Sequence, residues 1–407
     1  MAIFACTAGR CGSAARPLDG AIVSIKDLFD VEGQVTTAGS TQLKTQPAAT
    51  RDAPVIARLR QAGAVILAKT VTAELGGSHP GPTTNPFDPA RTPGGSSSGS
   101  AAAVAANMVP AAIGTQVGGS IIRPAAYCGN FALKPTQGGI NRGERLATSM
   151  STHGPHANSL EDMWQVAIEI TKRCGGDRGS LGLMGPDTLP AAIRPNRLIV
   201  LQTEGWPDAD DKTKAGFARL LDQLKAAGVA LIHRGDHPFV EALEKAIANG
   251  RAVCNGVTSW ENRWYQRGML DASPNGLSER AKATLLKAEA MTPDQYRINL
   301  LARQQAQVAH QAAAQLADAA ITLSCPGPAP IWSGDVPGQP LAARPTGDFV
   351  FNAPSSMLFA PVVTVPLMSV GGMPVGIQLM GQQHEDARMT GLARWFVENL
   401  KRVATPA

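Results

Sequence analysis

A strand-helix-strand unit near the middle of the chain limits the fold more than any other feature. Residues 196–202 (NRLIVLQ) and 229–233 (VALIH) are short apolar runs typical of strands, and residues 208–227 between them have the pattern of a helix. Strands joined in this order pair parallel, and the connection between them is a right-handed crossover. The unit therefore predicts an α/β fold with helices layered on a sheet.

The same alternation continues toward both ends of the chain. Asp52 is expected to be the N-cap of a helix at 52–62, with Gly63 ending that helix and 64–68 (AVILA) forming a buried strand after it. The other expected elements are a helix at 101–106, a strand at 111–115, helices over most of 236–319, a Pro-rich loop at 324–346, strands at 362–366 and 375–380, and a helix from 384 to about 400. No repeat or clear linker interrupts this order, which favours one large domain over residues 1–407.

Composition excludes several classes of function. Of the 407 residues, 44% are apolar and 17% are charged, which is typical of a globular protein. The 37 basic and 32 acidic residues give a formal charge of +5 without any basic run that could follow phosphates, so no nucleic-acid partner is expected. The most apolar stretch, 101–115, contains Asn107 and Pro110 and is too short to span a membrane.

The cysteines and the N-terminus indicate the compartment. The six cysteines, at positions 6, 11, 128, 174, 254 and 325, form neither CxxC pairs nor metal-type spacings with histidine. We expect reduced thiols in a cytoplasmic protein without a metal site. The first residues (MAIFACTAGR) have no basic start before their short apolar run, so no signal peptide is expected.

Residues 94–135 contain the groups best suited to chemistry. Two Gly/Ser clusters, 94–100 and 118–120, are joined by an Ala-rich helix and a short strand. The glycines of the second cluster allow a close approach of the backbone and a positive φ angle, and successive N–H groups in such a turn suit an oxyanion. Ser120 at the end of this turn is therefore a candidate nucleophile for acyl transfer, provided that a base accepts its proton.

The Gly/Ser clusters also allow other interpretations. Taken alone, such clusters are most often loops with only a structural role. Residues 95–99 (GSSSG) match the G-x-S-x-G nucleophile elbow of α/β-hydrolases, but the preceding NPFDPARTPG is not the apolar strand that this elbow needs. A phosphate-binding loop is excluded because no GK[ST] follows the glycines.

Three stretches together resemble the amidase signature family of Ser-Ser-Lys amidases. GGSSSGSAAAVAA and GTQVGGSIIRPAAYCGNFALKPT, within 94–136, are similar to the signature of the family. GAIVSIKDLFD at 20–30 is similar to its lysine segment, and VVTVPLMSVGGMPVGIQLMG at 362–381 is similar to its C-terminal strand pair. These stretches keep the order of the family, and the resemblance covers most of the chain outside about 180–345.

The resemblance implies a fold and a division of the chain. The fold is a mixed central β-sheet covered by helices on both faces, an α/β/α sandwich. The single amidase domain then has a signature core at 20–180, a variable and mostly helical substrate-side region at 181–345, and C-terminal strands and a helix at 346–407. Only 25 residues precede Lys26, where the family has a helical segment, so either the natural start lies upstream or this chain is short.

The resemblance also implies a catalytic triad. Ser120 corresponds to the nucleophile, Ser96 to a bridging serine held by a cis peptide bond, and Lys26 to the base. Lys26 can accept a proton only when it is neutral, and burial favours the neutral form by lowering the pKa. Without the resemblance, Lys26 would be read as a surface lysine beside Asp27.

Neighbours of the triad receive roles from the same resemblance. The oxyanion hole is formed by the backbone N–H groups of Val117, Gly118, Gly119 and Ser120. Ser97 and Gln116 support the triad.

Three positions depart from the common pattern of the family. Gln116 stands where aspartate is common, which is expected to alter the pKa of Lys26 without loss of activity, and Ser98 stands where glycine is common. Arg123 lies three residues after Ser120 rather than two, as in the malonamidase-like branch, where the arginine binds a substrate carboxylate. Arg123 is therefore a candidate carboxylate clamp, because a guanidinium is a bidentate donor. The alternative is that it pairs with a backbone or acidic group and only supports the loop.

The implied function is hydrolysis of a carboxylic amide through a covalent acyl-enzyme, without a metal or organic cofactor. The partner is a small-molecule amide, no nucleic acid or membrane is involved, and a homodimer is left open. One alternative is the catalytic subunit of a tRNA-dependent amidotransferase, which needs a partner protein. Another is an inactive relative that binds amides, against which the presence of all three triad residues argues.

Overall fold

The computed structural model describes residues 16–143 and 148–406, so the expectation for the first ten residues, together with Cys6 and Cys11, lies outside the described residues. Eleven described strands form one sheet. The strands are β1 (Ile22–Lys26), β2 (Val65–Thr70), β3 (Ala111–Gln116), β4 (Phe131–Lys134), β5 (Thr152–Ala157), β6 (Arg197–Val200), β7 (Ala230–Ile232), β8 (Ala319–Leu323), β9 (Val362–Val370), β10 (Met373–Met380) and β11 (Val403–Thr405). Their order is β2-β1-β3-β5-β4-β9-β10-β8-β6-β7, with β11 beside β9. Parallel pairs such as β1 with β3 and antiparallel pairs such as β9 with β10 confirm the predicted mixed sheet.

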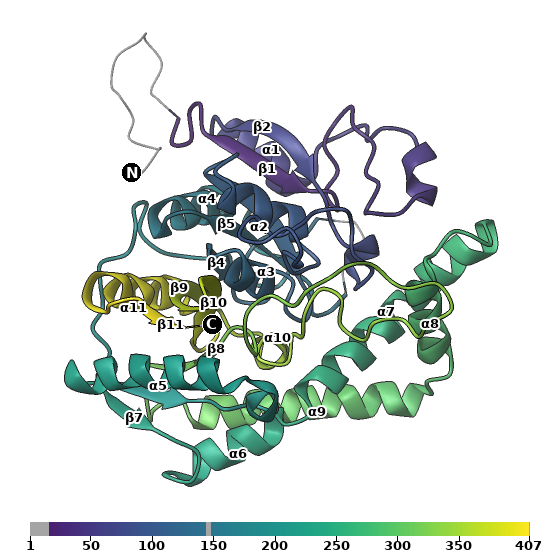
Figure 1. Cartoon of the computed structure of the whole chain (residues 1–407). Coiled ribbons are helices and arrows are strands. Elements are labelled where there is room, and N and C mark those ends of the chain that lie inside the picture. Colours follow the sequence, from purple (N-terminus) through teal and green to yellow (C-terminus); the bar gives the residue numbers. More distant parts are fainter. Residues whose placement is uncertain (1–15, 144–147, 407) are drawn as a thin grey trace.

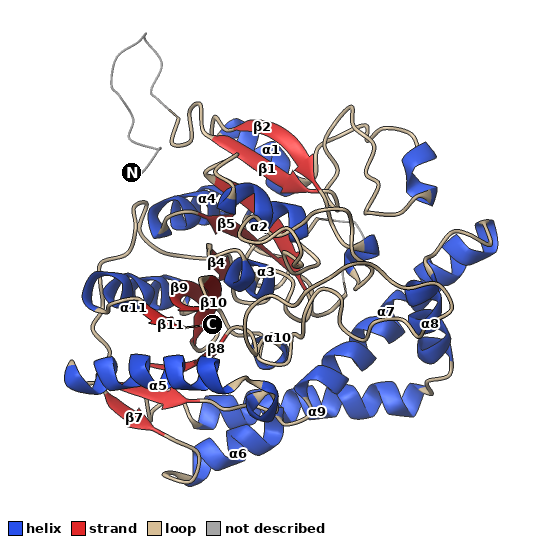
Figure 2. Cartoon of the chain, in the orientation of Figure 1, coloured by secondary structure: helices blue, strands red, loops and turns tan. Residues whose placement is uncertain are grey.

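Helices cover both faces of this sheet, as predicted (Figure 2). In β9, Val363 and Val365 pack into one apolar cluster and Val362 into another, because alternate residues point to opposite faces. The first face carries α1 (Pro54–Gln61), α4 (Leu160–Cys174), α5 (Asp211–Ala226) and α11 (Asp386–Asn399), and the second carries α2 (Ser98–Ala105), α3 (Ile122–Tyr127), α6 (Pro238–Ile247), α9 (Pro293–Ala312) and α10 (Ala353–Met357). Helix α7 (Gly250–Ala272) begins against the second face, where Val253 and Val257 join the same apolar cluster, and then extends away from the sheet together with α8 (Glu279–Glu289) (Figure 1). No helix in the described ranges has the length and apolarity needed to cross a membrane.

The strand-helix-strand prediction for the middle of the chain is confirmed. Strands β6 and β7 pair parallel, and α5 connects them. The helical interpretation of most of 236–319 also agrees with α6 to α9, and no helix or strand is found in 324–346. One sheet thus takes strands from the signature core, the variable region and the C-terminal segment; the division into these three segments stays a prediction.

Two local predictions near the N-terminal edge of the sheet are wrong. Asp52 does not cap α1, which begins after Ala53 without a side-chain cap; Asp52 instead accepts the N–H of Glu32 at 2.8 Å and pairs with Arg60. The run 64–68 is not buried either, because β2 is an edge strand in which Leu67 is 55% exposed. An apolar run by itself does not tell an edge strand from a central one.

Five strands, β1, β4, β5, β8 and β11, were not predicted, and all of these except β1 lack the usual signal. Strand β5 (THGPHA) is fully buried between β3 and β4 although three of its six residues are polar and a fourth is glycine. Strand β8 begins where the helical pattern of the preceding region ends, and β4 and β11 have only four and three residues. Strands that are very short, or that are buried on both faces, show no alternation of polar and apolar residues.

A buried lysine at the end of β4 predicts that stability rises with pH. Burial lowers the pKa of Lys134 to about 7 although the carboxylate of Asp386 opposes the shift, and its Nζ donates to the carbonyl of Pro135 at 2.9 Å. Between pH 7 and the usual pKa of lysine near 10.5, the unfolded chain binds a proton that the folded chain does not. The free energy of unfolding should therefore increase by about 2 kcal/mol from pH 7 to pH 9 through this group. Urea titrations of wild type and Lys134→Met across this range test it, because the variant should lose that part of the increase; equal slopes for both proteins would contradict the prediction.

Candidate active site

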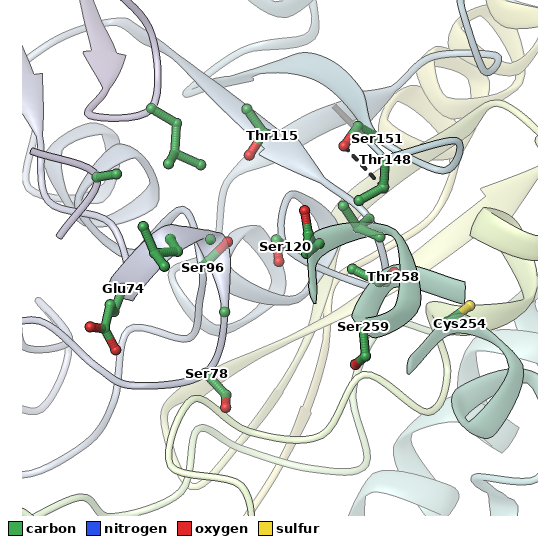
Figure 3. A pocket seen from close by; sticks show the side chains of 18 of the residues that line it. Glu74, Ser78, Ser96, Thr115, Ser120, Thr148, Ser151, Cys254, Thr258 and Ser259 are labelled. Atoms are coloured by element: carbon green, nitrogen blue, oxygen red, sulfur yellow. Dashed lines mark hydrogen bonds between the residues drawn. The ribbon is translucent and has the colours of Figure 1, made fainter. Parts of the chain in front are cut away.

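A cavity of about 2090 Å³ lies between the loops that follow β1 and β3, helices α7 and α8, and the loop 341–349. Ser96, Thr115 and Ser120 line it, with Thr258 and Ser259 of α7 on another side (Figure 3). Sites for small ligands commonly measure about 300–1,000 Å³. The cavity therefore has room for a substrate larger than a simple aliphatic amide.

Lys26 lies at the end of β1 and is completely buried behind this cavity. Its Nζ is 2.8 Å from the Oγ of Ser96 and 2.8 Å from the Oγ1 of Thr115. Burial, and to a smaller extent the positive charge of Arg123, hold the pKa of Lys26 well below its usual range. A lysine in this state can act as a proton acceptor, in contrast to the surface lysine of the alternative interpretation.

The serine cluster before α2 carries the partner of Lys26. The peptide bond between Gly95 and Ser96 is cis, and Ser96 is buried. The hydroxyl of Ser97 accepts the N–H of Thr115 and donates to its carbonyl oxygen, both at 3.2 Å, which joins the cluster to the end of β3. Ser98, which replaces a common glycine, is accommodated in the first turn of α2, where its hydroxyl donates to the carbonyl of Val71.

Ser120 closes a turn that connects β3 to α3. In the described part of the chain, no acceptor takes the N–H groups of this turn, which belong to Val117, Gly118, Gly119 and Ser120. Free N–H groups beside a serine hydroxyl can bind a developing oxyanion. The carbonyl of Ser120 accepts the N–H of Ser97 at 3.3 Å, so the two Gly/Ser clusters meet at this point.

The glycines of this turn are needed for a different reason than the predicted one. Neither Gly118 nor Gly119 has a positive φ angle, so this part of the prediction is wrong. A Cβ on Gly118 would lie 2.8 Å from the ring of Phe349, and a Cβ on Gly119 would lie 2.6 Å from Asn352. Glycine is therefore needed at these two positions because Phe349 and Asn352 pack directly against the backbone of the turn.

Gln116 holds the same turn rather than contacting the lysine. Its side-chain oxygen accepts the N–H groups of Ile121 and Ile122 at 2.9 and 3.0 Å, and its amide nitrogen contacts Ser356. Ser356 in turn donates to the carbonyl of Gly118. Gln116 thus stabilises the start of α3 and the turn, and its predicted effect on the pKa of Lys26 stays a prediction.

Arg123 lies on α3 and lines the cavity while being only 5% exposed. Its Nη2 donates to the carbonyl of Gly95 at 2.5 Å and to the Oγ1 of Thr346 at 3.2 Å. Burial lowers its pKa to about 10, so the guanidinium is still charged at neutral pH. The predicted support of the loop is thus present, while its Nε has no partner and no acidic side chain of the described residues pairs with it.

Sequence patterns did not single out four further residues in the site. Thr115 lies within the signature segment, so the motif itself was an available signal for it. Thr346 and Phe349 belong to a loop without periodicity that reaches the site only in the folded chain. His153 of β5 also lines the cavity, and burial lowers its pKa to about 3, so it is neutral. Within the described ranges, no three His, Cys, Asp or Glu side chains are grouped to hold a metal ion.

Comparisons with known proteins agree on one family. A family model described as Amidase matches residues 5–389. The A subunit of glutamyl-tRNA(Gln) amidotransferase from Thermus thermophilus is 30% identical, over 95% of this chain and 86% of its own length, and its counterpart from Chloroflexus aurantiacus is 32% identical, over 93% and 82%. A solved amidase superposes with a TM-score of 0.79 at 28% identity, covering 94% of this chain and 85% of its own. A protein from a complex that is related to the origin of an s-triazine catabolic enzyme superposes with a TM-score of 0.81 at 27% identity, covering 96% and 86%.

Proposed function

Because this chain belongs to the amidase family, we propose that it hydrolyses a carboxylic amide, with Ser120 as nucleophile, Ser96 as proton relay and Lys26 as base. The observation that carries the proposal is the 2.8 Å contact between the Nζ of the fully buried Lys26 and the Oγ of Ser96. A buried amine without a carboxylate partner favours its neutral form, which is the form that a base requires.

The proposed reaction proceeds in two halves. The hydroxyl of Ser120 attacks the amide carbonyl while its proton passes to Ser96 and the proton of Ser96 passes to Lys26. The N–H groups of the turn at 117–120 stabilise the oxyanion of the tetrahedral intermediate. When this intermediate collapses, the proton returns through Ser96 to the leaving amine, and an acyl-enzyme remains. Water then attacks the acyl-enzyme by the same relay and releases the acid.

Ammonia release by the purified chain tests the proposal. A panel of aliphatic, dicarboxylic and aromatic amides is incubated with the chain in the absence of ATP and of any other protein, and the Ser120→Ala variant supplies the blank rate. We expect release from at least one class of amide above this blank. Release that is equal in the two proteins for every amide would contradict hydrolysis by this site.

A second candidate function is that of one component of an amidotransferase, favoured by the similarity to the A subunit of glutamyl-tRNA(Gln) amidotransferase. In that case the ammonia formed at Ser120 is used by a partner protein rather than released. The two functions differ in the isolated chain, because a free amidase needs no partner for full turnover. Stimulation of ammonia release by more than about tenfold on addition of the remaining amidotransferase subunits would favour the second candidate.

We further propose that Arg123 selects amides that carry a carboxylate. A buried guanidinium without an acidic partner is a costly feature unless a ligand supplies the negative charge. Arg123→Met should lower kcat/KM for a dicarboxylic acid monoamide at least about tenfold more than for the neutral amide of the same chain length. Arg123→Lys, which keeps the charge, should retain part of this preference. An equal loss on both substrates would instead assign Arg123 only the support of the loop at Gly95.

A further inference from the structure

The Nζ of Lys26 has three acceptors around it, and two of them belong to one residue. Besides the Oγ of Ser96, it contacts the Oγ1 of Thr115 at 2.8 Å and the carbonyl oxygen of Thr115 at 3.4 Å. Thr115 lies near the end of β3, and Figure 3 shows its side chain in the same part of the cavity wall as Ser96 and Ser120. The relay proposed above uses only the contact with Ser96, so the contacts with Thr115 have no role in it yet.

The number of protons on the amine decides what these acceptors do. A neutral amine has two N–H bonds and one lone pair. If both N–H bonds point to Thr115, the lone pair is directed at the hydroxyl of Ser96, which is the direction that proton transfer requires. After the transfer, the ammonium has three N–H bonds, and the same three oxygens accept all of them. The nitrogen therefore keeps its position in both protonation states. Only the direction of its hydrogen bond with Ser96 reverses: the neutral amine accepts from the hydroxyl, and the ammonium donates to its oxygen.

We infer that Thr115 is a positioning residue that directs the lone pair of Lys26 toward Ser96. The inference rests on the proposed function of the site and adds a residue to it. Thr115 does not contact the reacting carbonyl in this role; it acts through Lys26.

Thr115 is itself held in place on its backbone side. Ser97 accepts its N–H and donates to its carbonyl oxygen, each at 3.2 Å. Strand β3 pairs with β1 in register up to Ile113 opposite Ile25, one residue before Lys26. Because β1, β3 and the serine cluster are joined in this way, the hydroxyl of Thr115 has a fixed position relative to the lysine.

The test measures the reactivity of Ser120 without requiring its natural substrate. A fluorophosphonate reacts with an activated serine: the Oγ of Ser120 forms a bond to phosphorus, fluoride leaves, and the serine proton passes through Ser96 to Lys26. The rate of labelling is measured from pH 5 to pH 10 for wild type, Thr115→Val and Thr115→Ser. Thr322→Val, at a buried threonine of β8 whose hydroxyl has no partner in the described chain, is the matched control.

Thr115→Val should lower the plateau rate about ten- to hundredfold, because the lone pair is no longer directed at Ser96. Its acid limb should also move to lower pH, since the lost acceptor stabilised the ammonium more than the neutral amine. Thr115→Ser keeps the hydroxyl and should stay within a few-fold of wild type, as should Thr322→Val. Arg123 of α3, with His153 and His156 of β5, are the other titratable groups that interact with Lys26, and all variants leave them in place.

Three results would overturn the inference: an unchanged plateau in Thr115→Val, an acid limb that moves to higher pH, or an equal loss in Thr115→Ser. A shift to higher pH is the signature of water entering a loosened site and restoring the usual pKa of lysine. If Thr115→Val does not fold, Thr115→Ala removes the same hydroxyl and carries the test. If the wild type is labelled but releases ammonia from none of the amides, the proposed function is refuted. The labelling rates of the variants still decide the role of Thr115 in that case.

Discussion

Replacement of Ser120 by alanine is expected to lower kcat for amide hydrolysis by at least about 10⁴-fold, to a residual rate set by binding and the oxyanion hole. The physical reason is that the neighbouring serine hydroxyls are engaged elsewhere: those of Ser97 and Ser98 donate to the carbonyls of Thr115 and Val71, and that of Ser356 donates to the carbonyl of Gly118. Without the nucleophile no acyl-enzyme forms, so an intact-mass measurement after rapid quenching should show an acylated species only in the wild type.

The control for this variant is Ser369→Ala, at another buried serine, which lies on β9 and does not line the cavity. It should retain the rate of the wild type within about twofold. A rate for Ser120→Ala above about one hundredth of the wild type would remove Ser120 from the proposed role.

Replacement of Lys26 by methionine is expected to lower kcat/KM by about 10³-fold and to abolish its acid limb. Methionine has a similar length and fills the same buried volume, but it accepts no proton. In the wild type, the folded pKa of Lys26 lies below the usual 10.5, so kcat/KM should rise about tenfold per pH unit until the pH passes that folded pKa and then level off. The variant should show no such rise, because the group that titrates is absent.

Stability measurements separate this loss from unfolding. Between the folded pKa of Lys26 and 10.5, the unfolded chain gains a proton that the folded chain excludes, which destabilises the fold. Lys26→Met removes this cost and should unfold at a urea concentration at least as high as that of the wild type. Lys134→Met, at the other fully buried lysine of the described chain, should share the gain in stability but keep the activity. An acid limb that persists in Lys26→Met would show that another group is the base.

The candidate catalytic residues could be proposed from the sequence because the short segments around them resemble the motifs of the family; without that resemblance Lys26 would be interpreted as a surface lysine. A serine that follows two glycines carries its own N–H donors with it, and the segment around Lys26 is similar to a known motif over eleven residues. The parallel unit of β6, α5 and β7 was predictable for a similar reason, since its order and its apolar runs lie within about forty residues. Such features depend on residues that are neighbours along the chain and not on contacts between distant segments.

The surroundings of the triad were decided by the tertiary structure alone. Lys26 and Ser96 are 70 residues apart, and Phe349, which requires glycine at 118, comes from a loop without any periodic pattern. The exposed edge position of β2 and the burial of the polar strand β5 depend on which strands pair, and pairing is a property of contacts between distant segments. The family of folds and the candidate reactive groups could thus be predicted from sequence patterns. Packing decided the burial that lowers the pKa of Lys26 and brought Thr115 to it, because desolvation and hydrogen-bond direction exist only once the chain has folded.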